Sequence, residues 1–188
     1  KHIELEVHLI DDILDLTRVA QGKLALQPRL IDLHAVVREA ITIVRAEIHE
    51  KQLIMAVQLH AEHYRVKGDS VRLQQVFWNL LRNAVKFTSS GGRISVESAV
   101  SADGLTWLGT IADTGIGLTE EEITHIFDAF AQGRHANTSA HAKFGGLGLG
   151  LTISQNLVKL HGGQIRVSSA GKDQGATFVV ELPLVHTE

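Results

Sequence analysis

Two hydrophobic periodicities alternate along the chain and predict a mixed α/β fold. Apolar residues spaced three and four apart predict helices at 33–51, about 70–87 and 151–161, with a short helix after Thr119. Shorter apolar or alternating runs bounded by turn residues predict strands. The predicted strands are 24–30, 52–59, 64–67, 93–101, 105–112, 164–169 and 176–182. This mixture implies an α/β (α+β) fold, a two-layer sandwich of one sheet with helices on one face.

The first 20 residues predict one long helix that precedes this domain. Its apolar residues recur in a four-three pattern, which is typical of a coiled-coil or bundle seam. They are Ile3, Val7, Ile10, Leu14 and Thr17. With a hinge at 21–23, we expect a helical element at 1–22 and a domain at 23–188. The alternative is an N-terminal helix packed on its own domain. Because the sequence starts at Lys1 within this helix, we expect a piece of a larger protein.

The predicted helix around 74–88 carries a polar stripe beside its apolar face. Asn79, Asn83 and Lys86 stand at i, i+4 and i+7 and therefore share one side of the helix. Two amides and an ammonium in line can hold a hydrated metal ion and the phosphates that it carries. The alternative is a solvated face.

A glycine-containing turn follows the predicted strand 105–112. Its sequence from Asp113 is Asp-Thr-Gly-Ile-Gly-Leu. Gly115 and Gly117 allow the backbone to approach a ligand closely. Asp113 can accept a hydrogen bond from an exocyclic amine such as that of adenine. The alternative is an ordinary Asx turn that leaves a strand.

A second glycine-rich segment, 145–151, opens the predicted helix 151–161. Four of its first six residues are glycine, which is a poor helix former. Free backbone N–H groups at the positive end of a helix suit an anion such as phosphate. The spacing fits neither the Walker phosphate loop nor the dinucleotide fingerprint. The alternative is a flexible loop.

Composition removes several classes of function. Charge is nearly balanced, with 18 basic and 21 acidic residues and a net charge of −3. The sequence therefore has no excess of positive charge that would indicate nucleic-acid binding. The sequence contains no cysteine, so disulfide bonds cannot stabilise the fold. No apolar run approaches 18 residues, so we expect no membrane contact by this fragment. The 11 histidines are scattered without His-Glu-x-x-His spacing, so we expect no histidine metal site.

Taken in order, these segments resemble the catalytic and ATP-binding domain of sensor histidine kinases. The resemblance rests on five motifs and covers most of the chain. They are an asparagine box at 79–88, a first glycine box at 113–118, a phenylalanine box at 126–130, a second glycine box at 145–151 and a glycine-threonine element at 175–178. Residues 9–26 resemble the second helix of the dimerisation and histidine-phosphotransfer domain, so 1–22 would be a truncated part of that domain.

The resemblance implies ATP and Mg²⁺ as cofactors. Asn83 would ligate Mg²⁺, and Asn79 would help to position the metal, a water or the γ-phosphate. Asp113 would read the adenine amine. The charges of Lys86 and Lys143, with Arg134 as a further candidate, would screen phosphate. Phe87 would pack on the base, and Thr177 would lie near it. The other implied contacts are Gly115, Gly117, Leu118, Phe130, Gly146, Leu147, Gly148, Leu149 and Gly150.

The chain departs from this family's pattern in two places. Residues 131–144 resemble a mobile lid over ATP, with a plain surface loop as the alternative. Ala142 replaces a common arginine there and Leu147 a usual threonine, which weakens the case for lid–phosphate contacts. The family's acceptor histidine, followed by an acid and a threonine-proline, is absent. His49-Glu50 comes closest and lacks that threonine-proline.

The implied reaction moves the γ-phosphate of ATP to a histidine and then to an aspartate of a response-regulator receiver domain. We expect a homodimer through the N-terminal helix and a cytoplasmic location, within a full-length protein that a membrane segment can anchor. One rival is an ATP-driven conformational clamp of the gyrase and chaperone type, which uses a glutamate near the position of Asn79. The other is a non-catalytic, nucleotide-regulated scaffold.

Overall fold

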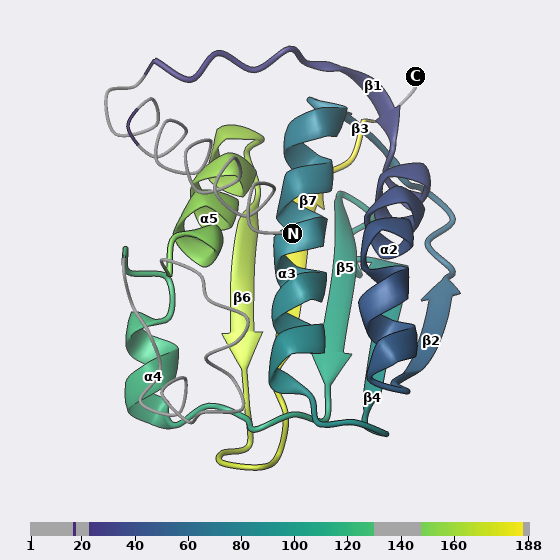
Figure 1. The fold of residues 1–188 in the computed structure, drawn as a ribbon. Coiled ribbons are helices and arrows are strands. Elements are labelled where there is room, and N and C mark those ends of the chain that lie inside the picture. The colour runs from purple at the N-terminus through teal and green to yellow at the C-terminus, as the bar shows by residue number, and fades with distance from the viewer. Residues whose placement is uncertain (1–16, 18–22, 130–147, 186–188) are drawn as a thin grey trace.

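The computed structural model describes residues 17, 23–129 and 148–185, and within them it has two layers (Figure 1). One layer is a five-stranded sheet in the order β2-β4-β5-β7-β6. β2 runs parallel to β4, and every other neighbouring pair is antiparallel. The strands are β2 (Ile54–Leu59), β4 (Arg93–Val100), β5 (Thr106–Asp113), β6 (Gln164–Ser168) and β7 (Thr177–Pro183).

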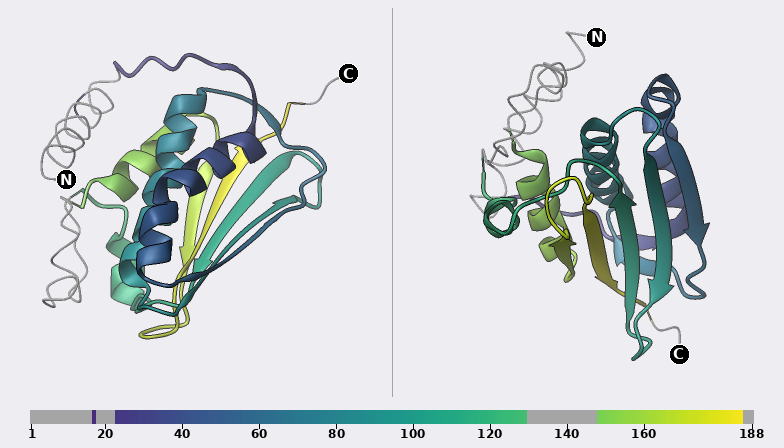
Figure 2. Two further views of the ribbon diagram at one scale, coloured as in Figure 1. Left: turned by 45° about the vertical axis from the view of Figure 1, so that its right-hand side comes forward. Right: turned by 90° about the horizontal axis from the view of Figure 1, so that it is seen from below.

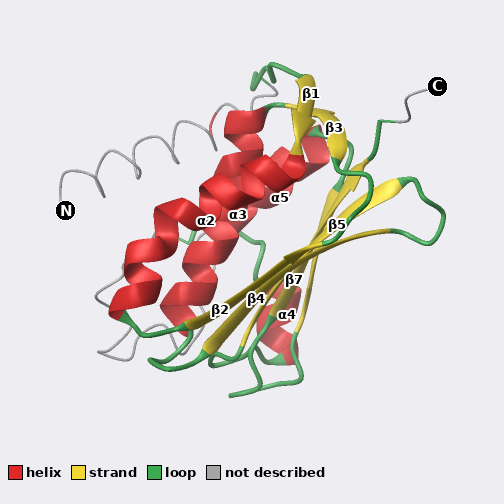
Figure 3. Cartoon of the chain, turned by 90° about the vertical axis from the view of Figure 1, so that its right-hand side faces the viewer, coloured by secondary structure: helices red, strands yellow, loops and turns green. Residues whose placement is uncertain are grey.

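The second layer consists of three helices on one face of this sheet (Figure 3). They are α2 (Leu33–Glu50), α3 (Ser70–Phe87) and α5 (Gly150–Leu160). Figure 2 shows the same layering from two other directions. The predicted two-layer sandwich is therefore confirmed. A short helix, α4 (Glu120–His125), begins with a capping box between Thr119 and Glu122, which satisfies two free N–H groups at its start.

Aspartates fix the starts of the two longest helices. The Asp32 side chain accepts from the N–H of Ala35 at the start of α2. The Asp69 side chain accepts from the N–H of Arg72 at the start of α3. Each of these N-caps satisfies a backbone donor that has no partner within its helix. Both helices therefore begin where the hydrophobic periodicity predicts.

One predicted strand is wrong in its bounds. The sequence predicts 24–30, but β1 (Arg29–Asp32) begins only after Pro28 and pairs antiparallel with β3 (Arg65–Gly68). Proline has no N–H to donate to a strand partner, so the pairing starts beyond it. Residues 23–28 have no regular structure. The other described elements begin and end within two residues of their predicted bounds.

The core lies between the helices and the inner face of the sheet. The rings of Phe77 from α3 and Trp107 from β5 meet edge to face, with centroids 5.8 Å apart. Alternate strand residues point inward, as a strand period of two requires. The buried strand residues include Ile94, Val96, Trp107, Ile111, Phe178, Val180 and Leu182.

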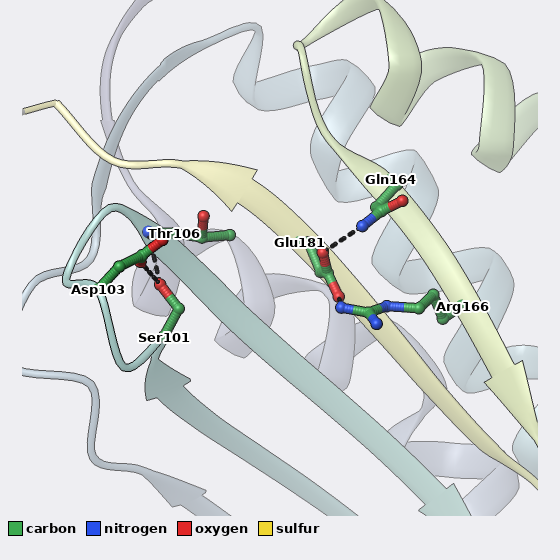
Figure 4. Close-up of polar contacts among 6 residues, drawn as sticks. All are labelled: Ser101, Asp103, Thr106, Gln164, Arg166 and Glu181. Atoms are coloured by element: carbon green, nitrogen blue, oxygen red, sulfur yellow. Dashed lines mark hydrogen bonds and ion pairs between the residues drawn. The ribbon is translucent and has the colours of Figure 1, made fainter.

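The opposite face of the sheet has a polar cluster, and no helix of the described residues covers it (Figure 4). The Glu181 carboxylate on β7 accepts a hydrogen bond from Gln164 at 2.6 Å and pairs with Arg166, both on β6. At the β4–β5 hairpin, Asp103 accepts from the Ser101 hydroxyl and the Leu105 N–H. These contacts explain how polar residues occupy an uncovered sheet face and its hairpin turn.

Two predicted segments lie outside the described residues. They are the N-terminal helix, of which only the helical residue Thr17 is described, and the lid at 131–144. Within the described residues, no helix combines the length and the apolar character needed to cross a membrane.

Candidate functional site

Asn79 joins the asparagine-bearing helix to the start of α5. Its side chain is buried, and its Nδ2 lies 3.3 Å from both the Gly150 carbonyl oxygen and the Ser154 hydroxyl oxygen. Ser154 is fully buried in α5, and the sequence analysis missed it. A polar residue on the inner face of a predicted helix is the signal that could have found it, because buried hydroxyls need a partner.

Asn83 and Lys86 lie further along the same stripe. Asn83 is half-buried, and no hydrogen bond joins its side chain to another residue in the part of the chain that the structure describes. The Lys86 ammonium lies 4.9 Å from the centroid of the half-buried Phe87 ring. Burial lowers the pKa of Lys86, and the charge of Arg82 lowers it further. An amide oxygen and a desolvated cation are thus available to a metal–phosphate ligand.

Asp113 ends β5 as a half-buried acid. Its carboxylate accepts from the Gly115 N–H at 2.8 Å, which forms an Asx-type turn. Burial raises the pKa of Asp113, while hydrogen bonds from the Gly115 and Ala176 backbones act in the opposite direction. A half-buried carboxylate with spare lone pairs is suited to accept a hydrogen bond from an amine donor.

The turn after Asp113 lies against the end of α3. The Ile116 N–H donates to the Phe87 carbonyl at 3.2 Å. A Cβ at Gly115 would stand only 2.4 Å from that same oxygen, so only glycine permits this approach. From the other side, the Leu118 N–H donates to the Ser169 hydroxyl, another residue that the sequence analysis missed.

Among residues 23–129 and 148–185, none accepts a hydrogen bond from the first backbone N–H groups of α5. Leu149 is the N-cap residue, and no side chain caps the helix there. Gly148 and Gly150 flank it, and Leu149 itself is buried in the core. The first N–H groups of a helix lack intrahelical partners and carry the positive end of its dipole. This arrangement suits an anion.

The described part of the site therefore follows the C-terminal half of α3. Asn79 contacts the start of α5, and Phe87 contacts the turn after Asp113. The step of eight positions from Asn79 to Phe87 corresponds to a rise of about 12 Å along the helix. Asn83 and Lys86 lie between the two. A ligand with a base at one end and phosphates at the other matches this order of groups.

Not every predicted residue is brought to this place. Thr177 lines a groove on the open face of the sheet with Leu108, Arg166 and Val179. The residue that reaches Asp113 is instead Ala176, through its backbone. The predicted contacts of Phe130, Lys143, Gly146 and Leu147 lie outside the described residues.

Comparisons with known proteins bear on this geometry. Residues 68–186 match the family described as histidine kinase-, DNA gyrase B-, and HSP90-like ATPase. The circadian input-output histidine kinase CikA of Synechococcus elongatus is 38% identical over 179 residues, which are 94% of this chain and 23% of that protein. The signal transduction histidine-protein kinase BarA of Escherichia coli is 37% identical over 94% of this chain and 19% of that protein.

A solved structure of full-length ShkA in complex with AMPPNP superimposes with a TM-score of 0.81. It is 28% identical and covers 96% of this chain and 36% of that protein. This chain spans less than a quarter of the length of CikA or BarA. The family match covers more than half of the chain and includes α3, the Asp113 turn and the start of α5. The chain therefore belongs to the histidine kinase-, DNA gyrase B-, and HSP90-like ATPase family, and its relatives within that family are sensor histidine kinases.

Proposed function

We propose that this chain is the ATP-handling part of a two-component sensor histidine kinase. The observation that carries the proposal is the order of three groups beside α3: the half-buried Asp113 carboxylate, the Asn83–Lys86 stripe and the start of α5, which no side chain of the described residues caps. The kinase relatives and the AMPPNP complex of ShkA support it.

In this proposal Asp113 recognises the base. Its carboxylate accepts from the exocyclic amine of adenine, while the Gly115 N–H keeps the carboxylate oriented. The half-buried Phe87 ring packs beside the base. Burial of the acid excludes water that would compete for the same hydrogen bond.

The phosphate end is bound by Asn83, Lys86 and the N–H groups at the start of α5. The Asn83 side-chain oxygen is a hard ligand of the kind that Mg²⁺ prefers, so the residues present fit the ion. When bound, Mg²⁺ would neutralise charge on the phosphates. The chain's own part is to orient the γ-phosphate and stabilise its charge, since phosphoryl transfer needs little covalent chemistry from the protein.

We further propose that the γ-phosphate passes to a histidine outside this sequence and then to a receiver-domain aspartate. Residues 1–22 would belong to the dimerisation helix pair of a homodimer, and the site would work in the cytoplasm. The clamp rival is less favoured, because an amide cannot take a proton from water as a glutamate does. The Asn79 amide is moreover engaged with Gly150 and Ser154.

The Mg²⁺-dependent part of ATP binding should depend on Asn83. Replacing Asn83 by alanine removes the proposed oxygen ligand, so MgATP affinity should fall about tenfold while Mg²⁺-free ADP affinity stays near that of the parent. Titration calorimetry with and without Mg²⁺ measures both values. Asn156→Ala is the matched control, since the Asn156 amide donates to the Thr152 carbonyl within α5. Equal losses with and without the metal would contradict the Mg²⁺ role.

Phosphoryl transfer tests the kinase assignment itself. The chain alone should form no phosphohistidine from γ-labelled ATP, because no acceptor motif is present. Adding a separate histidine-containing helix pair from a sensor kinase should produce acid-labile label on the added protein. ATP binding without any transfer would favour the scaffold alternative, whereas absence of ATP binding at millimolar nucleotide would remove the proposal altogether.

A further inference from the structure

Lys51, immediately after α2, reaches across to the last turn of α3. Its Nζ donates to the carbonyl oxygens of Val85 at 2.6 Å, Lys86 at 3.0 Å and Thr88 at 2.9 Å. A lysine ammonium has three N–H donors. One side chain from a neighbouring helix thus supplies donors to three carbonyls at the end of the asparagine-bearing helix.

The other carbonyls of this last turn also have donors. Helices end with carbonyls that lack intrahelical partners. The Ala84 carbonyl accepts from the Thr88 N–H at 3.1 Å and the Thr88 hydroxyl at 2.6 Å. The Phe87 carbonyl accepts from the Ile116 N–H. Each carbonyl from Ala84 to Thr88 is therefore satisfied, and Lys51 accounts for three of the five.

The Phe87 carbonyl links this turn to the adenine end of the site. It receives the Ile116 N–H, and Gly115 lies so close that a side chain would collide with it. The orientation of Phe87 therefore sets the position of the turn that carries Asp113. Orientation of Phe87 depends in turn on the two neighbouring carbonyls, Lys86 and Thr88, that Lys51 holds.

We propose that Lys51 is a positioning residue of the nucleotide site, which holds the last turn of α3 so that the Asp113 turn and the Asn83–Lys86 stripe keep their relative positions. The inference rests on the proposed nucleotide-binding function. Lys51 acts on the site through the backbone carbonyls of α3.

The electrostatics of Lys51 agree with this role. A cation at a helix C-terminus interacts favourably with the helix dipole. Burial lowers the pKa of Lys51, and the charge of Glu47 raises it in part. A cation that loses water in this way requires hydrogen-bond partners, and the α3 carbonyls supply them.

The test replaces Lys51 by methionine in the whole chain and measures two quantities below the unfolding temperature. The first is the amide exchange rate of Ile116, with Val180 in the sheet as an internal reference. The second is ADP affinity by calorimetry. We expect at least tenfold faster exchange at Ile116, unchanged exchange at Val180 and about tenfold weaker ADP binding, as loss of a charge-assisted anchor predicts. Lys51→Arg should restore both quantities.

Lys159→Met is the matched control, because Lys159 is exposed on α5 and its ammonium donates to the Gln155 side chain one turn earlier in the same helix. It should leave both quantities at the parent values. Unchanged exchange at Ile116 in Lys51→Met would overturn the proposal, as would equal acceleration at Ile116 and Val180. If Lys51→Met fails to fold, Lys51→Gln gives the same comparison. If the parent binds no ADP, the proposed function fails, and Ile116 exchange alone decides whether Lys51 holds the turn.

Discussion

Replacing Asp113 by asparagine should weaken ATP and ADP binding by roughly 10- to 100-fold and raise the stability of the free protein. Asparagine keeps an oxygen for the Gly115 N–H but loses the charge that strengthens the hydrogen bond to the adenine amine. Calorimetry gives the affinities, and thermal melting gives the stability. Both changes are expected together because the Asp113 charge strengthens nucleotide binding but destabilises the folded protein.

The stability gain follows from the raised pKa of Asp113. Its folded-state pKa lies above the ordinary value of 3.8, so the folded protein binds this proton more readily than the unfolded chain does. The contribution of Asp113 to the free energy of unfolding therefore falls as pH rises from 3.8 through the folded-state pKa. At neutral pH the full destabilising effect of the ionised side chain is present. Asp113→Asn should lack this slope. In the parent, nucleotide affinity should fall on acidification through that same raised pKa.

Asp103→Asn is the control for this prediction. Asp103 lies in the exposed β4–β5 hairpin, where hydrogen bonds from Ser101 and Leu105 lower its pKa. Losing its charge should therefore destabilise the protein slightly and leave nucleotide affinity unchanged. If Asp113→Asn bound ATP like the parent, Asp113 would not contact the base.

Gly117→Ala should destabilise the fold by about 2–4 kcal/mol, which lowers the melting temperature by roughly 5–15 °C. Gly117 has a φ of +66°, and a Cβ there would stand 2.0 Å from the Gly171 carbonyl oxygen. The β6–β7 loop or the Asp113 turn must move to admit it. Because the turn also carries Asp113, ATP affinity should fall at least tenfold in the folded fraction.

Gly104→Ala measures the energetic cost of a positive φ in the absence of a steric contact of the added Cβ. Gly104 has a similar φ of +75°, but nothing lies within 4 Å of its added Cβ. This variant should lose only about 1 kcal/mol and bind ATP like the parent. Equal destabilisation by the two variants would show that contact with Gly171 carries no cost.

Local patterns predicted the elements well where one strong signal dominates. α3 begins at Ser70 and ends at Phe87 as predicted, because its apolar period and the capping Asp69 agree. The strand predicted at 24–30 begins only at Arg29, because Pro28 has no N–H for strand pairing and the apolar residues before it cannot compensate for that missing donor. The placements of Asn83, Lys86 and Asp113 fit the predicted order of groups, but their ligand contacts remain predictions.

The sequence by itself determined the periodicity and the glycine turns, and hence the two-layer fold, while its ordered motifs indicated the family. These depend on residues close together in the chain, whose geometry a helix or strand period fixes. Only the tertiary structure decided that Asn79 bonds to Gly150 and Ser154, that Thr177 lies on the open face, and that Lys51 holds the end of α3. Those contacts join residues that are 34 to 75 positions apart. Sheet register and helix packing set such distances, and no local pattern records them.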